Sequence, residues 1–148
     1  MVDETRVPPS SPGEAPSHPG PIPLGTLLFG VYEVLDQLGS GGMGDVYRAR
    51  HRQLGGQRAI KVIHPAFAGR PEALEFFYLE ARAMLEVHHD AVVRCHDLLT
   101  GDDGRVYLVM EMVEGRSLSE WIREGPLSEN AVRALGARIA SGLAAAHR

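Results

Sequence analysis

A glycine-rich stretch between strand-like segments restricts the fold of this chain more than any other feature. Four of the six residues 39–44 are glycine. Residues 31–35 before this stretch and residues 46–50 after it are rich in β-branched and aromatic side chains, which favour strands. A third such segment, residues 58–63, follows another glycine turn. The pattern predicts three antiparallel strands that follow one another along the chain.

Glycines in such a loop have a use in binding a polyphosphate. Without Cβ atoms the backbone can approach the phosphates closely and point its N–H groups at their oxygens. The spacing of Gly39, Gly41 and Gly44 also occurs in dinucleotide-binding turns, where the third glycine opens a helix. Here a strand follows instead, which excludes that interpretation. An ordinary glycine hairpin without a ligand is the structural alternative.

The lysine usage of the chain singles out one residue. The sequence contains fourteen arginines and one lysine, Lys61, which lies in the third predicted strand. A slim ammonium on a flexible stem can reach a phosphate between packed strands, where the planar guanidinium of arginine does not fit. The alternative is a solvent-facing strand lysine. Its place after the glycine-rich stretch favours the phosphate-binding role.

Residues 71–87 are predicted to form a helix. A proline and two acidic residues stand near its start, and apolar side chains follow at helical spacing. Glu80 lies in the middle, near the apolar face. Its carboxylate can pair with Lys61 and hold the ammonium against the phosphates. The alternative for Glu80 is an ordinary surface pair with a neighbouring charge.

The last third of the chain predicts one hairpin and two helices. Residues 91–99 and 105–112 are strand-like and flank a turn that contains two glycines. Ser117 and Ser128 stand where they can cap the two helices. The second helix carries an apolar stripe, which invites a partner chain if it is exposed. The stripe consists of Val132, Leu135, Ile139 and Leu143.

The N-terminus has a different composition from the rest. Seven of the ten prolines fall within the first 23 residues, among serines and glycines. Such a stretch cannot bury enough apolar surface to offset its ordering entropy, so residues 1–28 are expected to be a disordered arm. A polyproline ligand for a proline-binding domain is the more specific alternative.

Composition excludes several classes of function. A net charge of −4 gives no sign of nucleic-acid binding through bulk charge. No run of 18 apolar residues and no secretory signal is present, so we expect no membrane segment in this chain. The single cysteine, Cys95, cannot form an internal disulfide, which fits a reducing, cytoplasmic location. No metal site is expected among the histidines and acids.

Four segments together resemble the eukaryotic-type protein kinases, and in particular the bacterial Hanks-type serine/threonine kinases. They are Leu38–Val46, Ala59–Lys61, Glu80 and Met110–Val113, in the family's order and spacing. The resemblance implies an α+β fold, with a small lobe of five antiparallel strands and one helix, a hinge, and the first two helices of a large lobe. It divides the chain into an arm (1–28), a small lobe with hinge (29–113) and the start of a large lobe (114–148).

The resemblance also implies roles for individual residues. The glycine loop would cover the phosphates of ATP, with Lys61 on the α- and β-phosphates and Glu80 orienting it. Met110 would lie behind the adenine as the gatekeeper, and the hinge backbone would hydrogen-bond the base. The ATP-binding residues implied are Leu38, Gly39, Ser40, Gly41, Gly42, Met43, Gly44, Val46, Ala59, Lys61, Met110, Glu111 and Val113.

The sequence departs from the family in what it lacks. Kinases use the aspartate of a His-Arg-Asp motif as catalytic base, and a catalytic-loop asparagine and an Asp-Phe-Gly aspartate as Mg²⁺ ligands. None of these motifs occurs in this chain. Two hypotheses follow. The chain is the ATP-binding part of a kinase that phosphorylates protein serine or threonine hydroxyls once the missing lobe is present. Alternatively, it is a non-catalytic nucleotide-binding or protein-interaction module, such as a truncated pseudokinase or half of a split kinase.

Overall fold

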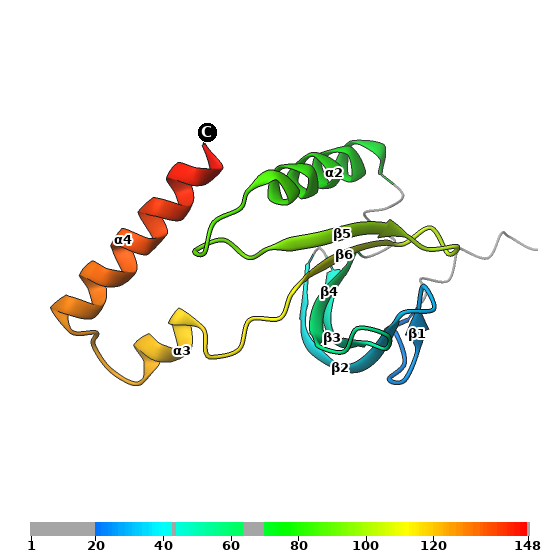
Figure 1. Cartoon of the computed structure of the whole chain (residues 1–148), viewed down its shortest axis with the longest axis horizontal. Coiled ribbons are helices and arrows are strands. Elements are labelled where there is room, and N and C mark those ends of the chain that lie inside the picture. Colours follow the sequence, from blue (N-terminus) through cyan, green and yellow to red (C-terminus); the bar gives the residue numbers. More distant parts are fainter. Residues whose placement is uncertain (1–19, 43, 64–69, 148) are drawn as a thin grey trace, which may run out of the picture.

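The computed structural model describes residues 20–42, 44–63 and 70–147, without the side chains of Ala73 and Glu80. Six antiparallel strands form one sheet in the order β1-β2-β3-β4-β6-β5 (Figure 1). The expected five strands and three helices are present, with β1 as an addition. The elements are β1 (Leu27–Leu28), β2 (Tyr32–Gly41), β3 (Gly44–His51), β4 (Gln57–Ile63), α2 (Pro71–Glu86), β5 (Cys95–Thr100), β6 (Val106–Glu111), α3 (Leu118–Arg123) and α4 (Glu129–Ala146).

Alternate residues of the strands build two apolar cores on opposite faces of the sheet. On β4, Ile60 and Val62 belong to one core, and Ile63 belongs to the other. Helix α2 covers the second face and inserts Phe77 and Ala81 into its core. Strand β6, which lies between β4 and β5, is buried on both faces from Val106 to Val109, which explains its nearly continuous apolar sequence.

Residues 20–28 differ from the expected disordered arm. Ile22 is buried in the core on the face of the sheet opposite α2, and its main-chain N–H donates to the Tyr47 hydroxyl at 3.0 Å. Strand β1 pairs with the start of β2, and the ring of Phe29 packs edge-on against Tyr107, with 5.1 Å between ring centroids. This segment is therefore part of the folded sheet. Residues 1–19 of the expected arm lie outside the described residues.

Helices α3 and α4 lie to one side of the sheet (Figure 1). Ser117 and Glu120 form a capping box at the start of α3, and the Ser128 side chain accepts a hydrogen bond from the N–H of Ala131 in α4. Both serine caps are thereby confirmed. None of the described helices is long and apolar enough to cross a membrane.

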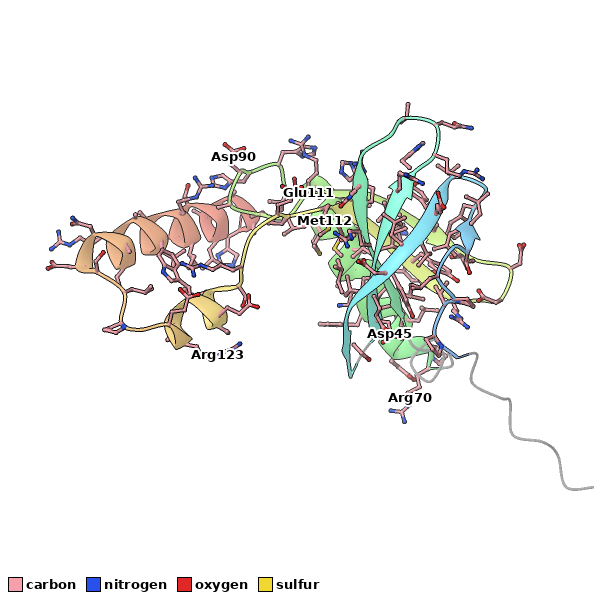
Figure 2. The ribbon with its side chains drawn as sticks, turned by 90° about the horizontal axis from the view of Figure 1, so that it is seen from below. Asp45, Arg70, Asp90, Glu111, Met112 and Arg123 are labelled. Atoms are coloured by element: carbon pink, nitrogen blue, oxygen red, sulfur yellow. The ribbon has the colours of Figure 1, made fainter. Side chains whose placement is uncertain are left out.

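The loop between α2 and β5 contacts α4, the helix farther along the chain. The imidazole Nε2 of His89 lies 2.9 Å from the Ser141 hydroxyl. The Arg138 guanidinium donates to the main-chain oxygen of Asp90, which is labelled in Figure 2, at 3.1 Å. Gly142 is the buried residue of α4 and packs against Ala91. This contact explains why the strand expected from residue 91 begins only at Cys95.

Candidate functional site

The glycines of the β2–β3 hairpin do two different things. A Cβ atom at Gly44 would lie 2.1 Å from the carbonyl oxygen of Val62, so only glycine lets β3 approach β4 this closely here. A Cβ atom at Gly39 or Gly42 would meet nothing within 4 Å. Gly44 is thus needed for strand packing, whereas the other two positions border open space.

Lys61 lies on the face of the sheet that α2 covers. In the register of the sheet Lys61 is opposite Val46 on one side and opposite Leu108 on the other. Directly paired residues share a face, and Leu108 belongs to the core beneath α2. Lys61 is half-buried there. Helix α2, which contains residue 80, packs on this same face.

A hollow of about 390 Å³ joins the hairpin to the lysine. Its volume lies in the range of small-molecule sites. It combines a cation, main-chain N–H groups and glycines without side chains, which is the chemistry that a polyphosphate needs. The described residues that line it are Gly39, Ser40, Gly41, Gly42, Gly44, Val46 and Lys61, all of which the sequence predicted.

Two predicted site residues cannot be placed in this arrangement. Met43 lies outside the described residues, and so does the side chain of Glu80. The role expected of Glu80 beside Lys61 therefore stays a prediction.

The remaining predicted residues lie at the end of β6 and beside it. Met110 is opposite Ala59 in the sheet, on the same face as Lys61. Val113 follows β6 with its side chain 62% exposed, and Leu38 on β2 is 45% exposed. Among the residues that the structure describes, the main-chain N–H and C=O of Val113 form no hydrogen bond. These groups are therefore available to a ligand.

A pair of hydrogen bonds that the sequence did not reveal holds Glu111. Its main-chain N–H donates to the carbonyl oxygen of Arg94 at 2.9 Å, and its carboxylate accepts from the N–H of Arg94 at 2.7 Å. Figure 2 shows Glu111 and Met112 where the sheet passes into the helical part of the molecule. The two bonds fix the direction in which the chain leaves the sheet.

Two titratable side chains near this point have shifted pKa values. Burial raises the pKa of the Cys95 thiol. Burial, together with the positive charges of Arg58 and Arg94, lowers the pKa of His96. Within the described ranges no three histidine, cysteine or acidic side chains lie close enough together to hold a metal ion.

Comparison with known proteins identifies the family. Residues 32–148 match the protein kinase domain family. The chain is 42% identical over 126 residues to serine/threonine-protein kinase pkn2 of Myxococcus xanthus, which covers 84% of this chain and 15% of that protein. It is 41% identical over 124 residues to serine/threonine-protein kinase PknL of Mycobacterium tuberculosis, which covers 82% of this chain and 31% of that protein.

The fold agrees with this match. The crystal structure of the Mycobacterium tuberculosis PknI kinase domain superimposes with a TM-score of 0.75 and 28% sequence identity, over 86% of this chain and 51% of that one. The chain thus spans about half of a solved kinase domain and no more than about a third of these curated relatives. With its α+β small-lobe fold and a sequence match over most of its length, this chain belongs to the protein kinase domain family.

Proposed function

We propose that this chain is the ATP-binding part of a serine/threonine protein kinase. The phosphates of ATP lie beneath the glycine-rich hairpin, and the Lys61 ammonium contacts the α- and β-phosphates. Glu80 orients that ammonium. The adenine lies against apolar side chains, with Met110 behind it, and hydrogen-bonds the backbone of Glu111 and Val113. The apolar side chains around the adenine are Leu38, Val46 and Ala59.

The hollow that contains Lys61 is the observation that carries this proposal. The one lysine of the chain and four of its loop glycines line the same 390 Å³ space, although Lys61 is seventeen residues from Gly44. The stem of Lys61 is flanked by Val46 and Leu108 in the sheet, and its ammonium is the one side-chain cation among the described residues that line the hollow. An anionic ligand accounts for its position, because it accepts hydrogen bonds from the ammonium and from loop N–H groups.

The reaction itself needs groups that this chain does not contain. In phosphoryl transfer a substrate hydroxyl oxygen forms a bond to the γ-phosphorus, the bond to the β–γ bridging oxygen breaks, and ADP leaves. Mg²⁺ would neutralise the charge that develops, and the kinase motifs that supply its protein ligands, the catalytic-loop asparagine and the Asp-Phe-Gly aspartate, do not occur in this sequence. The part played by this chain is to bind and orient ATP. The catalytic base and the metal ligands belong to the rest of a complete kinase.

Nucleotide binding by the chain tests the proposal. Titration with a fluorescent ATP analogue should show saturable binding that unlabelled ATP reverses. Lys61→Met should weaken binding about tenfold to a hundredfold, because hydrogen bonds to charged groups contribute about 1.5–3 kcal/mol. Arg133→Gln, which removes an exposed positive charge from α4, is the matched control and should bind normally. Equal affinity of the Lys61→Met variant and the unaltered chain would contradict the proposed site.

A second candidate function is that of a non-catalytic module or half of a split kinase. Three apolar side chains of α4 favour it, since Val132, Ile139 and Leu143 are each about half exposed. The mass of the natural polypeptide distinguishes the two candidates. A mass well above 16.1 kDa, together with kinase activity that Lys61→Met abolishes, supports the complete kinase. A mass near 16.1 kDa supports the module.

A further inference from the structure

The carboxylate of Glu111 occupies a place that a main-chain oxygen normally takes in a sheet. Two residues that form a hydrogen-bonded pair across antiparallel strands exchange both bonds, each N–H donating to the other residue's carbonyl oxygen. The Glu111 N–H does donate to the Arg94 carbonyl oxygen, at 2.9 Å. The Arg94 N–H, however, donates to Oε1 of the Glu111 side chain, at 2.7 Å. The side chain has therefore replaced the main-chain oxygen as the acceptor.

This replacement leaves the main-chain carbonyl oxygen of Glu111 out of the pairing with Arg94. In the part of the chain that the structure describes, no hydrogen bond joins the Arg94 N–H to that oxygen. The main-chain N–H and C=O of Val113, two residues farther along, also form no hydrogen bond with described residues. The backbone at this exit from the sheet thus keeps polar groups that Arg94 does not engage.

The Glu111 carboxylate lies on the face of the sheet that is opposite Lys61. Side chains alternate between the two faces along β6, since Leu108 belongs to the core beneath α2 and Val109 to the core on the other face. By this alternation Glu111 shares the face of Val109, and it is opposite Arg58 in the register of the sheet. Lys61 is opposite Leu108 and shares the face of α2. The carboxylate therefore acts on a nucleotide beside Lys61 only through the backbone.

We propose that the Glu111 side chain is a positioning group for the adenine base, an inference that rests on the proposed ATP site. By accepting the Arg94 N–H, the carboxylate releases the main-chain carbonyl oxygen of Glu111 to accept a hydrogen bond from the base. The group of adenine that donates such a bond is its exocyclic 6-amino group. The side chain thereby gives the site its preference for purines that carry a 6-amino group.

The chemistry of a carboxylate suits it to this task. An ionised carboxylate only accepts hydrogen bonds, and the bonds that it accepts are short, as the 2.7 Å distance to the Arg94 nitrogen is. Without that acceptor, the Arg94 N–H would turn to the main-chain carbonyl oxygen of residue 111, because the two residues already pair through their other bond. That oxygen would then be lost to the base.

Displacement of a fluorescent ATP analogue by two unlabelled nucleotides tests the proposal. The two are ATP and purine riboside triphosphate, which lacks only the 6-amino group. The unaltered chain should bind ATP about twofold to tenfold more tightly, the contribution of one hydrogen bond. Glu111→Ala should bring this ratio close to one, whereas Glu111→Gln should keep it, because the amide oxygen can accept the same bond. Partial unfolding of a variant lowers both affinities together and leaves their ratio unchanged.

Two further variants separate this role from a general loss of binding. Lys61→Met should weaken both nucleotides equally, and Glu129→Ala, which removes an exposed carboxylate from α4, should change neither affinity. A Glu111→Ala variant with the unaltered ratio overturns the inference, and so does a Glu111→Gln variant that behaves like Glu111→Ala. An unaltered chain that binds both nucleotides equally also overturns it, although the phosphate site at Lys61 would stand. A chain that binds neither nucleotide overturns the proposed function as well.

Discussion

At the scale of single residues, the loop glycines differ in what they contribute to folding. Gly44→Ala would place a Cβ atom 2.1 Å from the Val62 carbonyl oxygen, and that oxygen cannot move without separating β3 from β4. We expect this substitution to lower the free energy of unfolding by about 1–3 kcal/mol. Gly39→Ala meets open space and should leave that free energy unchanged. Urea unfolding of both variants measures the difference, and equal losses would contradict the assignment.

The sequence predicts residues whose chemistry is unusual for their position, and it misses residues whose role depends on distant partners. Lys61 was predictable because it is the one lysine beside fourteen arginines. The hydroxyl of Tyr47 was not, because its partner is the N–H of Ile22, twenty-five residues away. His89 likewise bonds Ser141 across fifty-two residues, whereas a histidine after a helix usually only ends it in solvent. No local pattern encodes such contacts.

At the scale of elements, two glycines of α4 provide a matched pair. A Cβ atom at Gly136 would meet nothing within 4 Å, so Gly136→Ala should stabilise the helix by about 0.5–1 kcal/mol. At Gly142 the new Cβ atom would lie 3.2 Å from the Ala91 Cβ and 3.3 Å from the Val92 Cγ2. The crowding there should cancel this gain or reverse it. Urea unfolding followed by circular dichroism compares the two, and an equal gain at both positions would contradict the contact.

The predicted boundaries of helices and strands agree with the structure where the local sequence pattern alone determines them. The capping box at Ser117 and the proline at the start of α2 mark helix starts that the structure retains. Strand β2 runs ten residues to Gly41, beyond the five that its composition predicted, because cross-strand pairing with β3 continues through the glycines. Strand β1 has two residues and depends on β2 for its pairing, so sequence alone could not predict it.

At the scale of the whole molecule, the fold joins two parts through two connections. The chain leaves the sheet at Glu111, whose paired hydrogen bonds to Arg94 set its direction. The loop before β5 then returns to α4 through His89 and Gly142. A nucleotide bound under the hairpin would lie on the sheet side of the first connection. The second connection sets where the helical part stands relative to the sheet.

The pH dependence of folding is another property of the whole molecule, and its acid side follows from two carboxylates. The Arg50 guanidinium lowers the pKa of Glu33, and hydrogen bonds from Ser117 lower that of Glu120. Carboxylates with lowered pKa values stabilise the folded state above the ordinary value of 4.5. Their contribution is lost as the pH falls through the lowered values. The urea midpoint should therefore decline below about pH 4.5.

At alkaline pH, the buried Cys95 thiol and Tyr107 phenol determine whether folding stability rises or falls with pH. Burial raises the pKa of Cys95 and of Tyr107. Above the ordinary thiol value of 9.0 the unfolded chain releases the Cys95 proton while the folded chain retains it. Stability is therefore complete below that value and falls as the pH rises further. Urea midpoints should decline above pH 9, and Cys95→Ala should make the decline shallower whatever its effect at pH 7. An unchanged slope in that variant would mean that the thiol ionises as easily inside the sheet as in water.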